Sequence, residues 1–143
     1  MRAPLARPAA VVACLVAAGC GTPSADLFVV QRSGSIPGAR LTMRVIDGGQ
    51  VRCNGGPLHD ISSDQLIEAR ALVRALAGDD KKDGPADRDV ALAPGPGAVL
   101  RYHVRLEAGT VAFSDTSRGQ PNVFFRVAKL TRDLARGPCR LPR

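Results

Sequence analysis

The clearest indication of the fold is the sequence of residues 39–54, which reads Ala-Arg-Leu-Thr-Met-Arg-Val-Ile-Asp-Gly-Gly-Gln-Val-Arg-Cys-Asn. Apolar and polar residues alternate over positions 39–45, and this period of two predicts a half-buried β-strand with one basic face. The Asp47-Gly48-Gly49 sequence is a strong signal for a hairpin turn. The chain then returns with Val51 and Cys53 on one side. The stretch therefore predicts two antiparallel strands joined by a tight turn.

A third strand is predicted immediately before this hairpin. Residues 27–31 are apolar and rich in residues that favour β-structure. The segment 33–38 then contains two glycines and a proline, which indicate a turn. Short connections of this kind predict three strands in antiparallel order.

A helix is predicted after residue 61. Ser62 is positioned to cap its first turn, Gln65 to bond back to Ser62, and Ile61 to pack against Leu66. Gly78 provides the stop signal. Apolar residues recur at helical spacing: Leu66, Ala69, Val73 and Leu76.

Residues 78–98 differ in composition from both neighbouring segments. They combine mixed charges with several prolines and glycines. Such a segment favours an exposed, flexible loop within one domain over regular structure.

The last third of the chain predicts a hairpin followed by a second helix. Residues 100–106 alternate, Ala108-Gly109 turns the chain, and residues 111–113 form the returning strand. The helix follows residues 117–122, ends at Gly137-Pro138, and buries this stripe: Val123, Val127, Leu130 and Leu134. The element order β-β-β-α-β-β-α predicts an α+β fold, an antiparallel sheet with two helices packed on one face.

The N-terminal residues resemble a bacterial lipoprotein signal. Arg2 and Arg7 precede an apolar run over residues 8–18, and Ala17-Ala18-Gly19 leads directly into Cys20. The resemblance implies cleavage before Cys20 and lipid attachment to its thiol. The alternative is ordinary secretion by a different peptidase, with Cys20 left as a spare thiol.

These features divide the chain into three parts. Residues 1–19 form the signal peptide, 20–26 a lipidated tether, and 27–143 a single domain. The protein is then exported and anchored by lipid to the outer face of the cytoplasmic membrane, because no second apolar stretch is long enough to span it. Loss of the two arginines of the signal lowers the formal net charge from +7 to +5.

Two cysteines of the mature domain remain after Cys20, namely Cys53 and Cys139. In an oxidising compartment such a pair predicts a disulfide. Without histidines at ligand spacing, two cysteines make a poor zinc site, and the sequence predicts no metal.

Several function classes lack their sequence signals. His59 precedes Asp60 in a loop, but no nucleophile elbow accompanies them, and His103 lies between arginines on a predicted strand. The aspartates of residues 79–89 are interleaved with cations and lack a calcium-loop register. No glycine-rich phosphate loop is present, and aromatic residues that would stack nucleic-acid bases make up only 3% of the chain. We expect no enzyme activity, no cofactor and no nucleic-acid partner.

Arginine is concentrated on the polar side of the predicted strands. The positions are Arg40, Arg44, Arg52, Arg101 and Arg105. Together they predict a basic sheet face opposite the helices, suited to the carboxylates or phosphates of anionic lipid, wall polymer or an acidic protein. The alternative is that long charged side chains only keep an exposed face soluble.

Three segments resemble the emfourin family, small bacterial inhibitors of thermolysin-like metalloproteases. They are the turn Arg32-Ser33-Gly34-Ser35-Ile36-Pro37-Gly38, the capped helix from Ser63, and the 100–115 hairpin with its terminal helix. The resemblance is mainly topological and spans most of residues 27–136. The lipid anchor, the cysteine pair and the inserted 78–98 segment depart from the family pattern. The chain also resembles small lipoproteins of high-GC actinobacteria, which implies location without activity.

We expect a monomeric binding domain, and the family resemblance implies that its partner is a protein such as a metalloprotease. The segment 32–38 would be the contact. The alternative function is an envelope-associated domain that binds anionic polymer or lipid through the arginine-rich sheet face.

Overall fold

The computed structural model describes residues 25–142 of the chain. The predictions for the signal peptide, for most of the tether and for lipidation of Cys20 lie outside these residues. The elements are β1 (Asp26–Gly34), β2 (Leu41–Ile46), β3 (Gln50–Cys53), β4 (Leu58–Asp60), α1 (Ser63–Ala77), β5 (Gly78–Asp79), β6 (Lys82–Asp83), β7 (Leu100–Leu106), β8 (Gly109–Ser114) and α2 (Asn122–Arg136).

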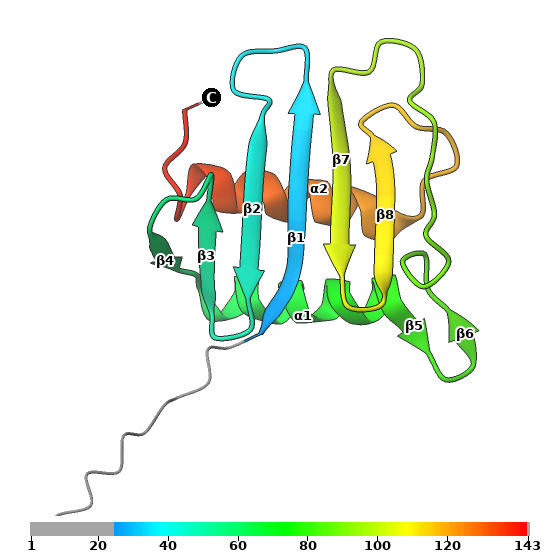
Figure 1. The fold of residues 1–143 in the computed structure, drawn as a ribbon, viewed down its shortest axis with the longest axis horizontal. Helices are drawn as coiled ribbons and strands as arrows, with labels where there is room; N and C mark the ends of the chain where they lie inside the picture. The colour runs from blue at the N-terminus through cyan, green and yellow to red at the C-terminus, as the bar shows by residue number, and fades with distance from the viewer. Residues whose placement is uncertain (1–24, 143) are drawn as a thin grey trace, which may run out of the picture.

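The predicted α+β architecture is confirmed. Six antiparallel strands form one sheet in the order β4-β3-β2-β1-β7-β8, so β1 pairs with both β2 and β7. Figure 1 shows α1 and α2 behind this sheet, on one of its two faces. We call the opposite side, which neither helix of the described residues 25–142 covers, the outer face.

The core fills the space between the sheet and the helices. The inward residues of the strands, among them Val30 and Val104, are fully buried, and Phe124 of α2 reaches the same layer. Phe124 stacks on Phe113 with ring centroids 4.6 Å apart, and Phe113 stacks on Tyr102 at 5.0 Å. Alternation along each strand therefore leaves the polar residues for the outer face.

The start of α1 confirms the predicted capping box. Ser62 Oγ accepts from the Gln65 backbone N–H at 3.2 Å, and Gln65 Oε1 accepts from the Ser62 N–H at 3.0 Å. The buried stripe differs in part from the predicted one, because Leu72 is fully buried whereas Leu66 and Val73 are only half-buried.

The segment 78–98 has more regular structure than its composition predicts. It begins with the β5–β6 hairpin and then follows the edge of β8. There the Leu92 N–H donates to the Ala112 carbonyl at 2.8 Å, and the Ala112 N–H donates to the Val90 carbonyl at 3.0 Å. Because β8 is at the edge of the sheet, its outward backbone groups need hydrogen-bond partners. The local sequence of the segment gives no sign that it supplies them.

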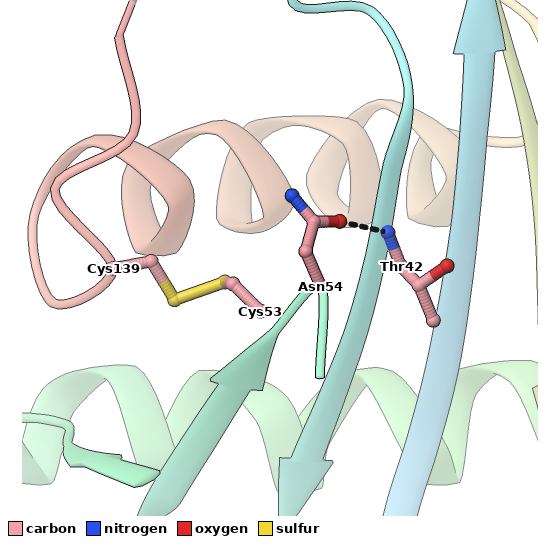
Figure 2. The surroundings of a disulfide bond; sticks show 4 residues. All are labelled: Thr42, Cys53, Asn54 and Cys139. Atoms are coloured by element: carbon pink, nitrogen blue, oxygen red, sulfur yellow. Dashed lines mark hydrogen bonds between the residues drawn. A yellow bond between two sulfur atoms is a disulfide. The ribbon is translucent and has the colours of Figure 1, made fainter. Parts of the chain in front are cut away.

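A disulfide between Cys53 and Cys139 confirms the predicted pairing (Figure 2). It joins the end of β3 to the chain that follows α2, with a Cα–Cα distance of 6.1 Å. Beside it, Asn54 Oδ1 accepts from the Thr42 N–H at 2.9 Å. A disulfide is typical of extracytoplasmic domains. Within residues 25–142, no helix is both long enough and apolar enough to cross a membrane.

Candidate functional site

The outer face carries all five arginines that the sequence placed on the polar side of the strands. The strand register arranges them in two rows that cross the sheet. The lower row consists of Arg52, Arg44 and Arg105, with Val29 between the last two. The upper row consists of Arg40 and Arg101, with Ser33 between them.

In the lower row, two guanidinium-bearing residues lie directly opposite each other. Arg44 pairs with Arg52 across β2 and β3, an arrangement of like charges that destabilises a sheet. Arg44 is partly neutralised because its guanidinium donates to Asp26 Oδ2 at 2.6 Å and 3.1 Å. Arg52 Nε is buried and has no acceptor among residues 25–142. The row therefore keeps an excess of positive charge.

In the upper row, both arginines flank one serine. Arg101 is the register partner of Ser33 across β1 and β7. Arg40 lies one position before Leu41, the last β2 residue paired with β1, and so reaches the level of Ser33 from the other side. In the part of the chain that the structure describes, neither arginine makes an ion pair or a side-chain hydrogen bond. Both guanidinium groups are available to a ligand.

A groove of about 580 Å³ runs across this upper part of the outer face. Its two ends differ in chemistry. Arg40, Arg101 and His103 give it a cationic and polar end, whereas Leu92, Pro94 and Ala112 contribute apolar surface. Guanidinium groups bind phosphate and carboxylate in bidentate fashion, so the cationic end is suited to an oxyanion.

The turn that follows β1 is held by an arginine side chain at the end of that strand. Arg32 lies on the helix side of the sheet, where its Nε donates to the Ala39 carbonyl at 2.9 Å and its Nη2 to the Gly38 carbonyl at 3.0 Å. The Ala39 N–H in turn donates to the Ile36 carbonyl at 3.1 Å. Arg32 therefore holds the turn from within, and the Ile36 side chain remains 47% exposed.

The turn is also fixed to the beginning of β7. The Ser35 N–H donates to the Val99 carbonyl at 3.1 Å, and a side chain on Gly34 would lie 2.0 Å from that same oxygen. Beneath the turn, burial raises the pKa of Tyr102, an effect that the nearby positive charges of Arg32 and Arg132 partly offset.

The two histidines lie apart from each other. His59 belongs to β4, opposite Val51 and half-buried, while His103 lies on the outer face opposite Gln31. Asp60 accepts from Gln50 Nε2 at 3.1 Å and makes no bond to His59. Across residues 25–142, no group of three or more His, Cys, Asp or Glu side chains is placed to hold a metal ion.

Sequence reasoning identified the arginines of this face but missed the apolar side of the groove. Leu92 and Pro94 belong to the 78–98 segment, and no local pattern indicates that this segment follows the β8 edge. The sequence predicts that Ser33 lies in the turn, whereas it belongs to β1 and lies between the two upper arginines.

Comparisons of this chain with protein-family models, with curated proteins and with solved structures find no match.

Proposed function

We propose that this protein is a binding module of the cell envelope that holds an anionic partner on the outer face of its sheet. The partner presents phosphate or carboxylate groups, as envelope lipids and envelope polymers do. One observation carries the proposal: five arginines lie in two rows on a face that no helix of residues 25–142 covers, and within the same residues only Arg44 of the five is ion-paired.

The expected strength of such binding comes mainly from charge. An arginine near an anionic surface contributes about 1 kcal/mol, so the four unpaired arginines together supply several kcal/mol at low ionic strength. Exposed charges are screened over about 8 Å at physiological salt. Binding through this face must therefore weaken steeply as salt is added.

The location of the protein supports the same proposal. The signal-like N-terminus and the Cys53–Cys139 disulfide both favour an extracytoplasmic domain. With lipid on Cys20, the domain would stay at the outer face of the cytoplasmic membrane, close to anionic lipids and polymers. A diacyl anchor supplies the two chains that stable attachment requires.

The test uses the mature chain from residue 20 with Cys20→Ser. Its binding to phosphatidylglycerol vesicles, phosphatidylcholine vesicles and polyphosphate is measured at low and physiological salt. We expect salt-sensitive binding to the anionic vesicles or polymer, and its loss in the Arg40→Gln/Arg52→Gln/Arg101→Gln variant. Arg74→Gln/Arg132→Gln/Arg136→Gln, which removes three exposed arginines from the helices, is the matched control. Equal binding by the outer-face variant and the wild type would refute the proposal.

A second candidate function has its own supporting observation. The segment 32–38, which comprises the end of β1 and the turn after it, is held by internal hydrogen bonds and leaves Ile36 exposed, with Val99 beside it 39% exposed. A preformed turn loses little conformational entropy on binding, as a protein inhibitor requires. This favours a protein partner, with a thermolysin-like metalloprotease as the candidate.

That candidate is tested by titrating a thermolysin-like metalloprotease with the same Cys20→Ser chain. Stoichiometric loss of protease activity without cleavage of the chain is expected, together with its relief by Ile36→Asp. No inhibition by the folded, oxidised protein would remove this candidate.

A further inference from the structure

We infer that the outer-face groove takes an amphiphilic oxyanion, a phosphate or carboxylate attached to an alkyl chain. This inference rests on the proposed function, because it assigns a ligand class to part of the same arginine-rich face. It adds that an apolar group of the ligand is recognised as well as its charge.

The charged group of the ligand lies over Ser33. Adjacent strands are about 4.8 Å apart, so the Cα atoms of Arg40 and Arg101 lie about 10 Å apart on either side of this serine. Both side chains are long enough to converge above β1, and neither has a competing acceptor among residues 25–142. Two guanidinium groups and one hydroxyl then surround a single oxyanion, which is the donor set that phosphate and carboxylate groups bind.

The apolar side of the groove is preformed. The Leu92 N–H donates to the Ala112 carbonyl at 2.8 Å, which holds this part of the segment against β8. Farther along, Ser117 Oγ donates to the Ala93 carbonyl at 2.9 Å, and Thr116 Oγ1 donates to the Gly95 carbonyl at 3.0 Å. These bonds place Leu92 and Pro94 at the groove without requiring a ligand to order them.

Two unpaired arginines beside a preformed apolar surface fit an alkyl anion better than they fit a simpler ligand. A free inorganic phosphate would use the arginines and leave the apolar surface wet, and a polyanion would bring further charge against it. An alkyl chain removes that surface from water, and each buried methylene raises the affinity about fourfold. The volume of about 580 Å³ lies in the range of small-molecule sites.

The inference is tested by calorimetry on the Cys20→Ser mature chain with soluble, monomeric dodecyl phosphate. The comparison ligands are dodecanoate, inorganic phosphate and uncharged dodecyl maltoside. Because three or four methylenes are buried, one of the two alkyl anions is expected to bind about 100-fold more tightly than inorganic phosphate. The alkyl anion that binds more tightly identifies the head group. Dodecyl maltoside is expected to bind much more weakly than either anion.

Three variants locate the ligand. Arg40→Gln/Arg101→Gln is expected to weaken binding of the alkyl anion at least tenfold. Leu92→Ala is expected to weaken binding of the alkyl anion and to leave binding of inorganic phosphate unchanged. Pro94→Ser repeats this test at a more exposed position. Leu58→Ala, an exposed leucine at the opposite edge of the sheet, is the matched control.

The outcomes separate the inference from the proposed function. If the alkyl anions bind no tighter than inorganic phosphate, while anionic vesicles or polyphosphate still bind through the arginines, the amphiphile inference is wrong and the proposed function stands. If dodecyl maltoside binds as tightly as the anions, the charged group has no role and the inference is also wrong. If no anionic probe binds, both fail.

Discussion

Arg44 lies directly opposite Arg52 on the outer face, across strands β2 and β3. A like-charged pair at this position lowers the stability of the sheet, and Asp26 relieves only the Arg44 side of it. A face that served solubility alone would gain from a neutral or acidic residue at either position. The retained repulsion is the pattern expected where binding, rather than folding, uses the charge.

Replacing Arg52 with threonine separates these two roles. Arg52→Thr is expected to raise the free energy of unfolding by about 0.5 kcal/mol at low salt, because the opposing charge is removed, and to weaken binding to anionic vesicles. Arg105→Thr is the control, since Arg105 faces Thr110 and Val29 rather than another cation. It should weaken binding without the gain in stability. Urea denaturation and vesicle sedimentation measure the two effects, and unchanged vesicle binding in both variants would count against the proposed function.

The first turn of α1 depends on the capping box at Ser62. Ser62→Ala removes the acceptor for the Gln65 N–H and is expected to lower the free energy of unfolding by about 1 kcal/mol. Ser63→Ala, one position later and inside the helix, should change it little. Equal effects of the two substitutions in thermal denaturation would contradict the assigned cap.

The disulfide closes a sequence separation of 86 residues. In the chain-entropy account, loss of such a link destabilises the folded state by about 4 to 5 kcal/mol, a large share of the stability of a small domain. Cys53→Ala/Cys139→Ala is therefore expected to lower the urea midpoint substantially. Addition of reductant should lower the midpoint of the wild type and leave that of the variant unchanged. An identical midpoint for the wild type with and without reductant would contradict this role.

The two hydrogen bonds from Arg32 organise the turn before β2. Arg32→Met keeps much of the apolar stem but removes the donors to Gly38 and Ala39. We expect a loss of about 1–2 kcal/mol in stability and faster amide exchange over residues 35–39. Ser35→Ala, which leaves these bonds intact, is the control. Unaltered exchange in Arg32→Met would show that the turn is held by other contacts.

Local sequence patterns predicted the faces of the strands and the limits of the helices. Alternation over 39–45 and 100–106 correctly identified which residues lie inward, and the Ser62 and Gly78 signals correctly bounded α1. These features depend on neighbours within a few residues, which is why a single sequence reveals them.

Long-range pairing was not accessible in the same way. Alternation shows which face a residue occupies but not which strand lies beside it, so the pairing of β1 with β7 had no local signal. The same holds for β4 and for the path of the 78–98 segment along β8. The cationic half of the groove was therefore predictable from the alternation of residues along the strands. Its apolar half depends on the unpredicted contact of the 78–98 segment with the edge of β8.

Mapping polyphosphate binding onto the structure by NMR tests whether the outer face is the anion-binding surface. We expect amide and arginine Nε resonances to shift at the outer-face positions of β1, β2, β3 and β7, with Arg40, Arg52 and Arg101 most affected. Resonances of α1 and α2, including Arg74 and Arg136, should remain in place. Shifts centred on the helices, or none on the outer face at low salt, would show that the outer face does not bind the anion.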